Sequence, residues 1–262
     1  MGLFDKKYCD ICGEKIGLLG NKKLEDANMC KKCAKNLSPW FKERRHTDLE
    51  GIKEQLADRE ANRDRVAAFN ATYAAGEKVK VYIDEKARTF MATKVDLSNK
   101  ERLEEENPDV ISLDNVLNCT VEPESYRTEL HHTNSQGESV SYDPPRYEYH
   151  YDFKFKITLN HPYLDEIKFD LNNRDLVIEY SDNSLFGLGT LHPENDFEYR
   201  RYINMGNELT EHLTSAEQVE AAPQAQNEQG NSVPLVTCPY CGSKSRLTTT
   251  GRCENCGGIL EG

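Results

Sequence analysis

The chain lacks any long hydrophobic run. No apolar stretch approaches the roughly 20 residues needed to cross a bilayer, and residues 1–7 contain no apolar segment of the kind that directs secretion. Hydrophobic residues make up 37% of the 262 residues and charged residues 30%, which is a polar composition. We therefore expect a cytoplasmic protein without a transmembrane segment.

The sequence also lacks the short motifs that carry common catalytic chemistry. It contains no Gly-rich phosphate loop, no Gly-x-Ser-x-Gly motif and no His-Glu-x-x-His motif. Cys119 has no neighbouring His in the sequence that could act as a base, and we expect it to be a buried strand residue. We therefore predict no catalytic residue, no bound organic cofactor and no small-molecule substrate.

Cysteine is present in a regular pattern. Eight of the nine cysteines occur in four Cys-x-x-Cys pairs. Two residues between cysteines allow one tight turn to supply two thiolates, and a tetrahedral Zn²⁺ binds four of them at about 2.3 Å. In a reducing compartment such pairs are metal or redox sites more often than disulfides. The predicted metal ligands are Cys9, Cys12, Cys30 and Cys33 in a first quartet, and Cys238, Cys241, Cys253 and Cys256 in a second.

Each quartet is expected to hold one structural Zn²⁺, which makes two per chain. Four sulfur ligands close the coordination sphere and leave no position for a catalytic water. Rubredoxin-type iron uses similar turns and is an alternative, as is thiol redox chemistry in which oxidation releases the metal. The second quartet lies in a segment too short for a hydrophobic core, so metal binding must supply most of its folding free energy.

Residues 1–46 are predicted to form the first zinc module. Gly13 follows the second thiolate, where a turn needs a residue that tolerates positive φ. We expect a small hairpin that turns at Gly20 and Asn21, and a short helix that ends before Pro39. This plan resembles a treble-clef zinc finger. The segment is basic, with 11 Lys and Arg against 6 Asp and Glu.

Residues 47–76 are predicted to form a connecting helix. Thr47 and Glu50 match a capping box with the hydroxyl at the cap, and apolar residues recur at helical spacing over residues 49–56. Residues 57–65 are nearly all polar. We therefore expect that half of the helix to be exposed and to act as a spacer.

Residues 77–214 are predicted to form antiparallel strands followed by a helix. Apolar residues alternate with polar ones near residues 79–93, which favours a hairpin. The clearest strand is residues 146–159, where Tyr, Phe and Ile share one face. Residues 131–146 lack periodicity and are predicted to be an exposed loop. A broken apolar stripe predicts a final helix over residues 193–213.

Two resemblances add to this reading. The order of elements in residues 77–214, including the stretch Ile111–Val116 after the first hairpin, resembles a pleckstrin-homology-like (PH-like) barrel, also seen in GRAM-type domains. That resemblance implies binding of a ligand or partner. The whole arrangement also resembles an uncharacterised group of bacterial proteins that combine a Cys-x-x-Cys-Gly zinc finger with a terminal zinc ribbon, and it implies no activity. The residues that carry this second resemblance are Met1–Phe4, Cys9–Gly13, Lys23–Asp26 and Cys30–Cys33.

Residues 215–235 are rich in Ala, Gln, Glu and Asn, and we expect a disordered linker. Residues 236–262 follow as the zinc ribbon. The expected fold is therefore α+β: a treble-clef-like zinc module, a helix, an antiparallel PH-like β-barrel with a C-terminal helix, a flexible linker and a C-terminal zinc ribbon.

The expected function is that of a non-enzymatic adaptor or scaffold that recognises a macromolecular partner. A tethered second module would add avidity through its effective concentration. One alternative is a redox- or zinc-responsive regulator. Another is nucleic-acid binding through the basic N-terminal module, whereas residues 78–214 carry 15 basic against 27 acidic residues and disfavour an anionic partner. We expect a protein partner.

Overall fold

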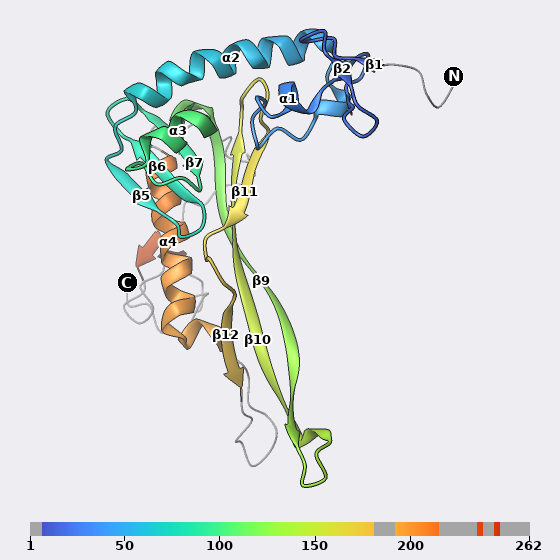
Figure 1. Cartoon of the computed structure of the whole chain (residues 1–262). Helices are drawn as coiled ribbons and strands as arrows, with labels where there is room; N and C mark the ends of the chain where they lie inside the picture. The colour runs from blue at the N-terminus through green and yellow to red at the C-terminus, as the bar shows by residue number, and fades with distance from the viewer. Residues whose placement is uncertain (1–6, 181–191, 215–234, 238–243, 247–262) are drawn as a thin grey trace, which may run out of the picture. The chain divides into compact units, whose positions relative to one another are not determined.

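The computed structural model describes residues 7–180, 192–214, 235–237 and 244–246 (Figure 1). The chain divides into two compact units, Met1–Glu220 and Ala221–Gly262. In the second unit, strands β13 (Leu235–Thr237) and β14 (Lys244–Arg246) pair antiparallel. The second cysteine quartet and residues 215–234 of the predicted linker lie outside the described residues. The finer division of the first unit stays a prediction.

The first unit begins with a small module of short strands around one helical turn. Its elements are β1 (Lys7–Tyr8), β2 (Lys15–Ile16), β3 (Lys22–Lys23), β4 (Asn28–Met29), α1 (Lys31–Ala34) and the 3-10 turn η1 (Arg44–His46). Strand β1 pairs with β2, and β3 pairs with β4. The prediction of a hairpin turning at Gly20 and Asn21 is wrong, because the tight β3–β4 turn closes where Leu24 N–H donates to the carbonyl of Ala27 at 2.9 Å.

Helix α2 (Leu49–Ala68) follows this module. Its N-cap is Asp48, whose carboxylate accepts from Gly51 N–H at 2.9 Å. The predicted cap, Thr47, instead donates its hydroxyl to the carbonyl of Glu43. The negative charge of a carboxylate at the cap also interacts favourably with the positive end of the helix dipole, and a neutral hydroxyl lacks this charge.

Two antiparallel sheets follow, each of four strands. The first has the order β5-β6-β7-β8, formed by Tyr73–Ala75, Lys80–Asp84, Thr89–Thr93 and Ile111–Ser112. Helix α3 (Lys100–Glu106) and the 3-10 turn η2 (Leu113–Asn115) lie along the same stretch of chain. The predicted hairpin is confirmed, since Val81 pairs with Ala92 and Ile83 with Phe90.

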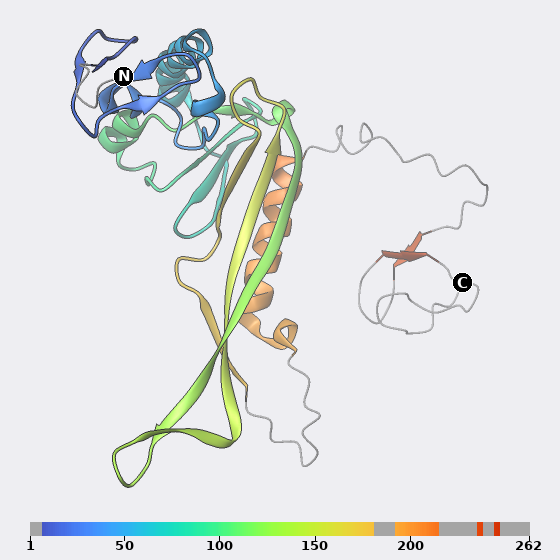
Figure 2. The same cartoon turned by 90° about the vertical axis from the view of Figure 1, so that its right-hand side faces the viewer.

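The second sheet is organised around one long hairpin, β9 (Val116–Thr133) and β10 (Ser139–Leu159), visible in Figures 1 and 2. Strands β11 (Glu166–Asp170) and β12 (Leu176–Tyr180) both pair with β10. Residues 131–146 are mostly exposed, as predicted, but they are not simply a loop. Strand pairing continues to Thr133 and Ser139, residues 134–138 turn the chain, and residues 142–145 form an irregularity without β9 partners. Backbone pairing does not require the apolar alternation on which that prediction relied.

The main hydrophobic core lies between the two sheets and helix α4 (Phe197–Leu213), which follows the 3-10 turn η3 (Pro193–Asn195). On β10 the alternation predicted from sequence is confirmed, with Phe153, Phe155 and Ile157 fully buried. Helix α4 packs closely on β9: a Cβ placed on Gly206 would lie 2.6 Å from Cβ of Val121. Glycine is needed here because the helix backbone approaches a branched side chain.

The described residues form no closed barrel, which corrects the PH-like expectation. The two sheets stay separate because β8 pairs only with β7, and the η2 turn redirects the chain before β9 begins. Strand β10 pairs with β9 along one edge and with both β11 and β12 along the other. The coarser expectation of an α+β fold with antiparallel sheets and a C-terminal helix is confirmed. Within the described residues, no helix is both long and apolar enough to span a membrane.

Candidate metal centre and its support

The four cysteines of the first quartet meet at one point. One sulfur atom from each of Cys9, Cys12, Cys30 and Cys33 lies within 4.8 Å of the other three. Sγ of Cys9 lies 3.8 Å from Sγ of Cys33, and Sγ of Cys12 lies 3.8 Å from Sγ of Cys30. A tetrahedral zinc site with Zn–S bonds of about 2.3 Å requires sulfur–sulfur distances of about 3.8 Å. The quartet therefore has the dimensions of a four-thiolate metal site.

Local backbone geometry places the first pair. Gly13 has φ of 73°, and its N–H donates to the carbonyl of Cys9 at 2.7 Å, which closes the turn that carries Cys9 and Cys12. Positive φ at Gly13 confirms the reason for a glycine there. The second pair lies at the start of α1, where Sγ of Cys30 caps the helix by accepting from Cys33 N–H at 3.4 Å.

The environment of Cys9 favours a thiolate. Burial alone would raise the pKa of its thiol, but backbone N–H groups directed at the sulfur lower the pKa to about 7. These donors belong to Cys12, Cys30 and Ile11, and Cys30 N lies 3.2 Å from Sγ of Cys9. By contrast, burial and the neighbouring sulfurs raise the pKa of Cys33. Four adjacent sulfurs repel one another as thiolates, and a divalent cation removes that repulsion.

The module also has its own small core. The buried side chains around the quartet are Ile16, Leu24, Met29, Leu37 and Ile52. Because Ile52 belongs to α2, this helix contributes directly to the folding of the metal module. Asp26 adds a second link, since its carboxylate accepts from Leu49 N–H at 2.9 Å.

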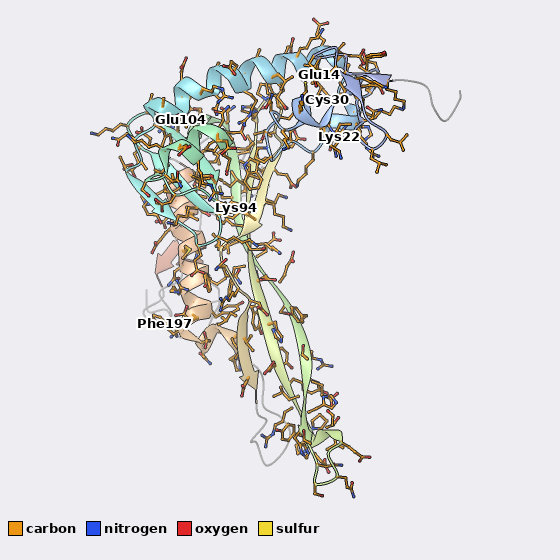
Figure 3. The ribbon with its side chains drawn as sticks, viewed as in Figure 1. Glu14, Lys22, Cys30, Lys94, Glu104 and Phe197 are labelled. Carbon is orange, nitrogen blue, oxygen red and sulfur yellow. The ribbon has the colours of Figure 1, made fainter. Side chains whose placement is uncertain are left out.

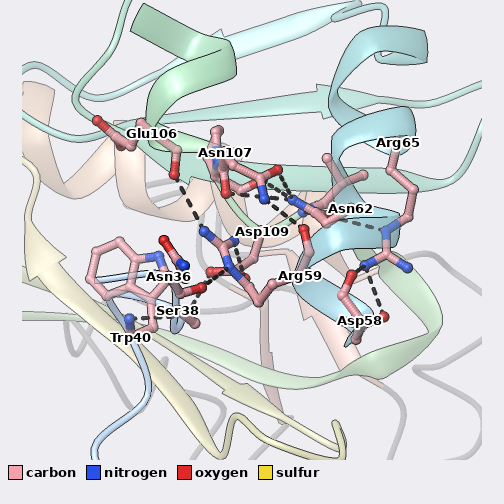
Figure 4. A network of polar contacts seen from close by, with 12 residues as sticks. Asn36, Ser38, Trp40, Asp58, Arg59, Asn62, Arg65, Glu106, Asn107 and Asp109 are labelled. Carbon is pink, nitrogen blue, oxygen red and sulfur yellow. Dashed lines mark hydrogen bonds and ion pairs between the residues drawn. The ribbon is translucent and has the colours of Figure 1, made fainter. Parts of the chain in front are cut away.

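The prediction that the polar half of α2 is exposed holds for most of residues 57–65 but fails at two of them. Arg59 and Asn62 are buried, and they connect the helix to the chain before α2 and to the chain after α3 (Figure 4). Nη1 of Arg59 lies 2.8 Å from Oδ1 of Asp109, and Nε donates to the carbonyl of Asn36 at 3.2 Å. The other oxygen of Asp109 accepts from the Ser38 hydroxyl at 2.6 Å.

Asn62 completes this buried polar network one turn further along α2. Its Nδ2 donates to Oδ1 of Asn107 at 2.8 Å and to the carbonyl of Pro108 at 2.7 Å. Its Oδ1 accepts from Val110 N–H at 3.0 Å. Asn107 adopts φ of 47° at the end of α3 and returns a hydrogen bond to the carbonyl of Arg59 at 2.7 Å. We call the residues Arg59, Asn62, Asn107 and Asp109 with Ser38 the polar seam.

The polar seam holds the metal module, α2 and the strand body together. Ser38 and Asn36 come from the end of the module, and the seam contacts them through Arg59 and Asp109. Sequence reasoning missed it because buried and exposed polar residues look alike in one sequence. One signal was available: Gln55, Arg59, Asn62 and Val66 recur at helical spacing and all lie buried on one face.

The other cysteines are Cys119 and the four of the second quartet. Cys119 is 7% exposed, and its burial raises the pKa of the thiol to about 12, as expected for a buried strand residue. Of the eight predicted ligands, the structure brings together the four cysteines of the first quartet. Cys238, Cys241, Cys253 and Cys256 lie outside the described residues, and a second site is not shown.

Comparison with known proteins identifies one region. Residues 7–55 match the family described as Domain of unknown function (DUF4428). The match contains all four cysteines of the first quartet and ends inside α2. It agrees with the resemblance inferred over the N-terminal region, and nothing found names a PH domain. Neither the curated proteins nor the solved structures contained a match to the chain.

Proposed function

We propose that this chain is a non-enzymatic, zinc-stabilised adaptor that recognises a protein partner through the far end of the β9–β10 hairpin. The observation that carries the proposal is exposure. None of residues 122–150, which we call the distal ribbon, is buried, although most of them are in paired strands. Strand β12 pairs with β10 from Tyr147 onward, so between Glu129 and Tyr147 the hairpin has only two strands. A two-stranded ribbon without a hydrophobic face is marginally stable. A partner that covers one of its faces would supply the missing burial.

The composition of the distal ribbon supports a protein partner. Arg127 stacks on the ring of Tyr147 at 4.7 Å, and Arg146 stacks on Tyr142 at 4.5 Å. Tyr and Arg are enriched where protein interfaces gain most of their affinity, and the stacked pairs hold these side chains in place before binding. The ribbon carries six acidic residues against two arginines. This charge disfavours nucleic acid and favours a partner with a basic surface.

The metal centre has a supporting role in this proposal. We assign Zn²⁺ to the first quartet because four sulfurs at tetrahedral spacing match its preference. A four-thiolate site is closed, so the metal stabilises the module and takes no part in catalysis. The second Zn²⁺, at the terminal quartet, is supported by Cys-x-x-Cys spacing alone.

A photo-crosslinking amino acid in place of Tyr142 tests the proposal in the protein's own cells. Phe197, which is 69% exposed at the start of α4, provides the matched aromatic control. We expect a discrete protein adduct from position 142, absent from position 197 and lost when Arg127→Ala and Arg146→Ala are added. Adducts that are identical from both positions, or that persist in the Arg variant, would contradict the distal ribbon as the recognition surface.

One observation favours a second candidate, a redox- or zinc-responsive regulator. Cys12 is exposed, whereas the other three cysteines of the quartet are buried. An oxidant therefore has access to one ligand of the site. This alternative predicts that mild peroxide releases zinc and that blocking access to Cys12 slows the release. Retention of zinc through that treatment would exclude it.

A further inference from the structure

The metal module presents two adjacent leucines to solvent. Leu18 and Leu19 are 87% and 86% exposed. They occupy the two central positions of a turn in which Gly20 N–H donates to the carbonyl of Gly17 at 2.9 Å. Central turn positions are usually filled by Gly, Pro, Asn, Asp or Ser. Two large apolar side chains at the apex of a tight turn have an energetic cost in water that a polar turn would avoid.

This exposure is specific to the turn. Ile16 and Leu24 lie on either side of it and are 7% and 1% exposed, within the core of the module. The sequence thus supplies four large apolar residues over a short stretch, and folding buries the outer two while leaving the central two in solvent. The turn lies between the two Cys pairs in sequence, so the metal centre anchors the chain on both sides of it.

Three exposed lysines flank the leucines in the sequence. Lys15, Lys22 and Lys23 are exposed and flank the turn, and residues 15–24 contain no Asp or Glu. None of the three forms an ion pair with a residue that the structure describes, whereas Lys32 of the same module lies 2.9 Å from Glu14. In the view of Figure 3, Cys30 lies between helix α2 and Lys22. The lysines therefore keep their charge available for an external anion.

From this arrangement we infer that the turn docks on an anionic lipid bilayer. Leu18 and Leu19 enter the boundary between headgroups and acyl chains, and the lysines contact the lipid phosphates. Exposed apolar residues flanked by cations match the layering of that boundary. A nucleic acid would use the lysines and leave the leucines in water. Two leucines and three lysines provide weak, reversible attachment, which suits a docking module. The inference is independent of the distal ribbon.

Vesicle sedimentation with the zinc-loaded full chain tests this inference. The probes are phosphatidylcholine vesicles with and without phosphatidylserine. We expect binding only when phosphatidylserine is present. Leu18→Ser with Leu19→Ser should weaken it at least about tenfold, and Lys22→Gln should weaken it about fivefold. All substituted side chains are exposed, so the zinc content should stay unchanged.

Matched controls come from elsewhere in the chain. Leu117 is 62% exposed on β9, and Lys94 is exposed after β7. Leu117→Ser and Lys94→Gln should leave vesicle binding unchanged. Absence of binding to phosphatidylserine vesicles would overturn the inference. So would loss in the lysine variant without loss in the leucine variant, because that pattern indicates surface adsorption without insertion.

A direct measure of insertion uses fluorescence. Leu18→Trp should be quenched by lipids brominated in their acyl chains, while the parent protein, whose sole tryptophan is Trp40, should not be quenched. Tight binding of the wild-type full chain to an oligonucleotide, with no quenching of the Leu18→Trp variant by brominated vesicles, would assign the lysines to nucleic acid and refute the membrane assignment.

Discussion

Removing the guanidinium of Arg59 should destabilise the first unit strongly. In Arg59→Met the carboxylate of Asp109 would stay buried without its cation, since the Asp109 side chain is only 11% exposed. The carbonyls of Asn36 and Glu106 would also lose a donor. Breaking a buried pair by removing one partner costs about 3–5 kcal/mol. That is a large part of the roughly 5–15 kcal/mol that stabilises a typical domain.

Urea unfolding of the zinc-loaded chain measures this loss. Trp40 is the only tryptophan, and its backbone N–H donates to the Ser38 hydroxyl in the polar seam, so its fluorescence reports on the affected region. Arg63 provides the matched control, one turn along α2 in a side-chain pair with Glu60 that is 51% and 77% exposed. Arg63→Met should change stability by less than about 0.5 kcal/mol. Equal midpoints for the two variants would refute the argument that the buried pair connects the module to the body.

Three further predictions concern packing and burial. Gly206→Ala should destabilise the chain by about 1–3 kcal/mol because the new Cβ would overlap Val121, despite a gain of about 1 kcal/mol in helix propensity. In urea unfolding, Val121→Ala should restore the stability that Gly206→Ala removes. Absence of that rescue would contradict the contact. Burial raises the pKa of Cys119 to about 12, so its thiol should resist iodoacetamide at pH 8 until the chain unfolds, as intact mass would show. Because the unfolded thiol ionises near about pH 8.5, its contribution to stability should be constant below that pH and fall as pH rises, and Cys119→Ala should remove this alkaline loss. Gln55 is 2% exposed, and neither side-chain polar atom has a hydrogen-bond partner among the described residues, so Gln55→Met should raise stability by about 1–3 kcal/mol; an unchanged or lower melting temperature would contradict this.

The first metal centre could be predicted from sequence because its information is local. Two Cys-x-x-Cys pairs specify the ligands, and Gly13 specifies the turn that holds the first pair. The alternation of residues 146–159 likewise predicted the buried face of β10, since a half-buried strand has a period of two. In these elements, one short stretch of sequence contains the physical reason for its structure.

The polar seam and the distal ribbon could not be predicted in the same way. Arg59 is buried because Asp109, 50 residues away, neutralises it. Between residue 146 and the tip of the hairpin, β9 and β10 are paired by backbone hydrogen bonds, which leave no apolar pattern in the sequence. The prediction of a closed barrel was wrong for a related reason. The order of strands in sequence does not state which strands pair, and β10 takes three partners here.

Metal content of the purified chain tests the central claim most directly. Elemental analysis should find two zinc ions per chain in the wild type. Cys30→Ser with Cys33→Ser should leave one, and the same change at Cys253 and Cys256 should also leave one. A wild-type chain that is folded without zinc, or a first-quartet variant that keeps the full zinc content, would contradict the account.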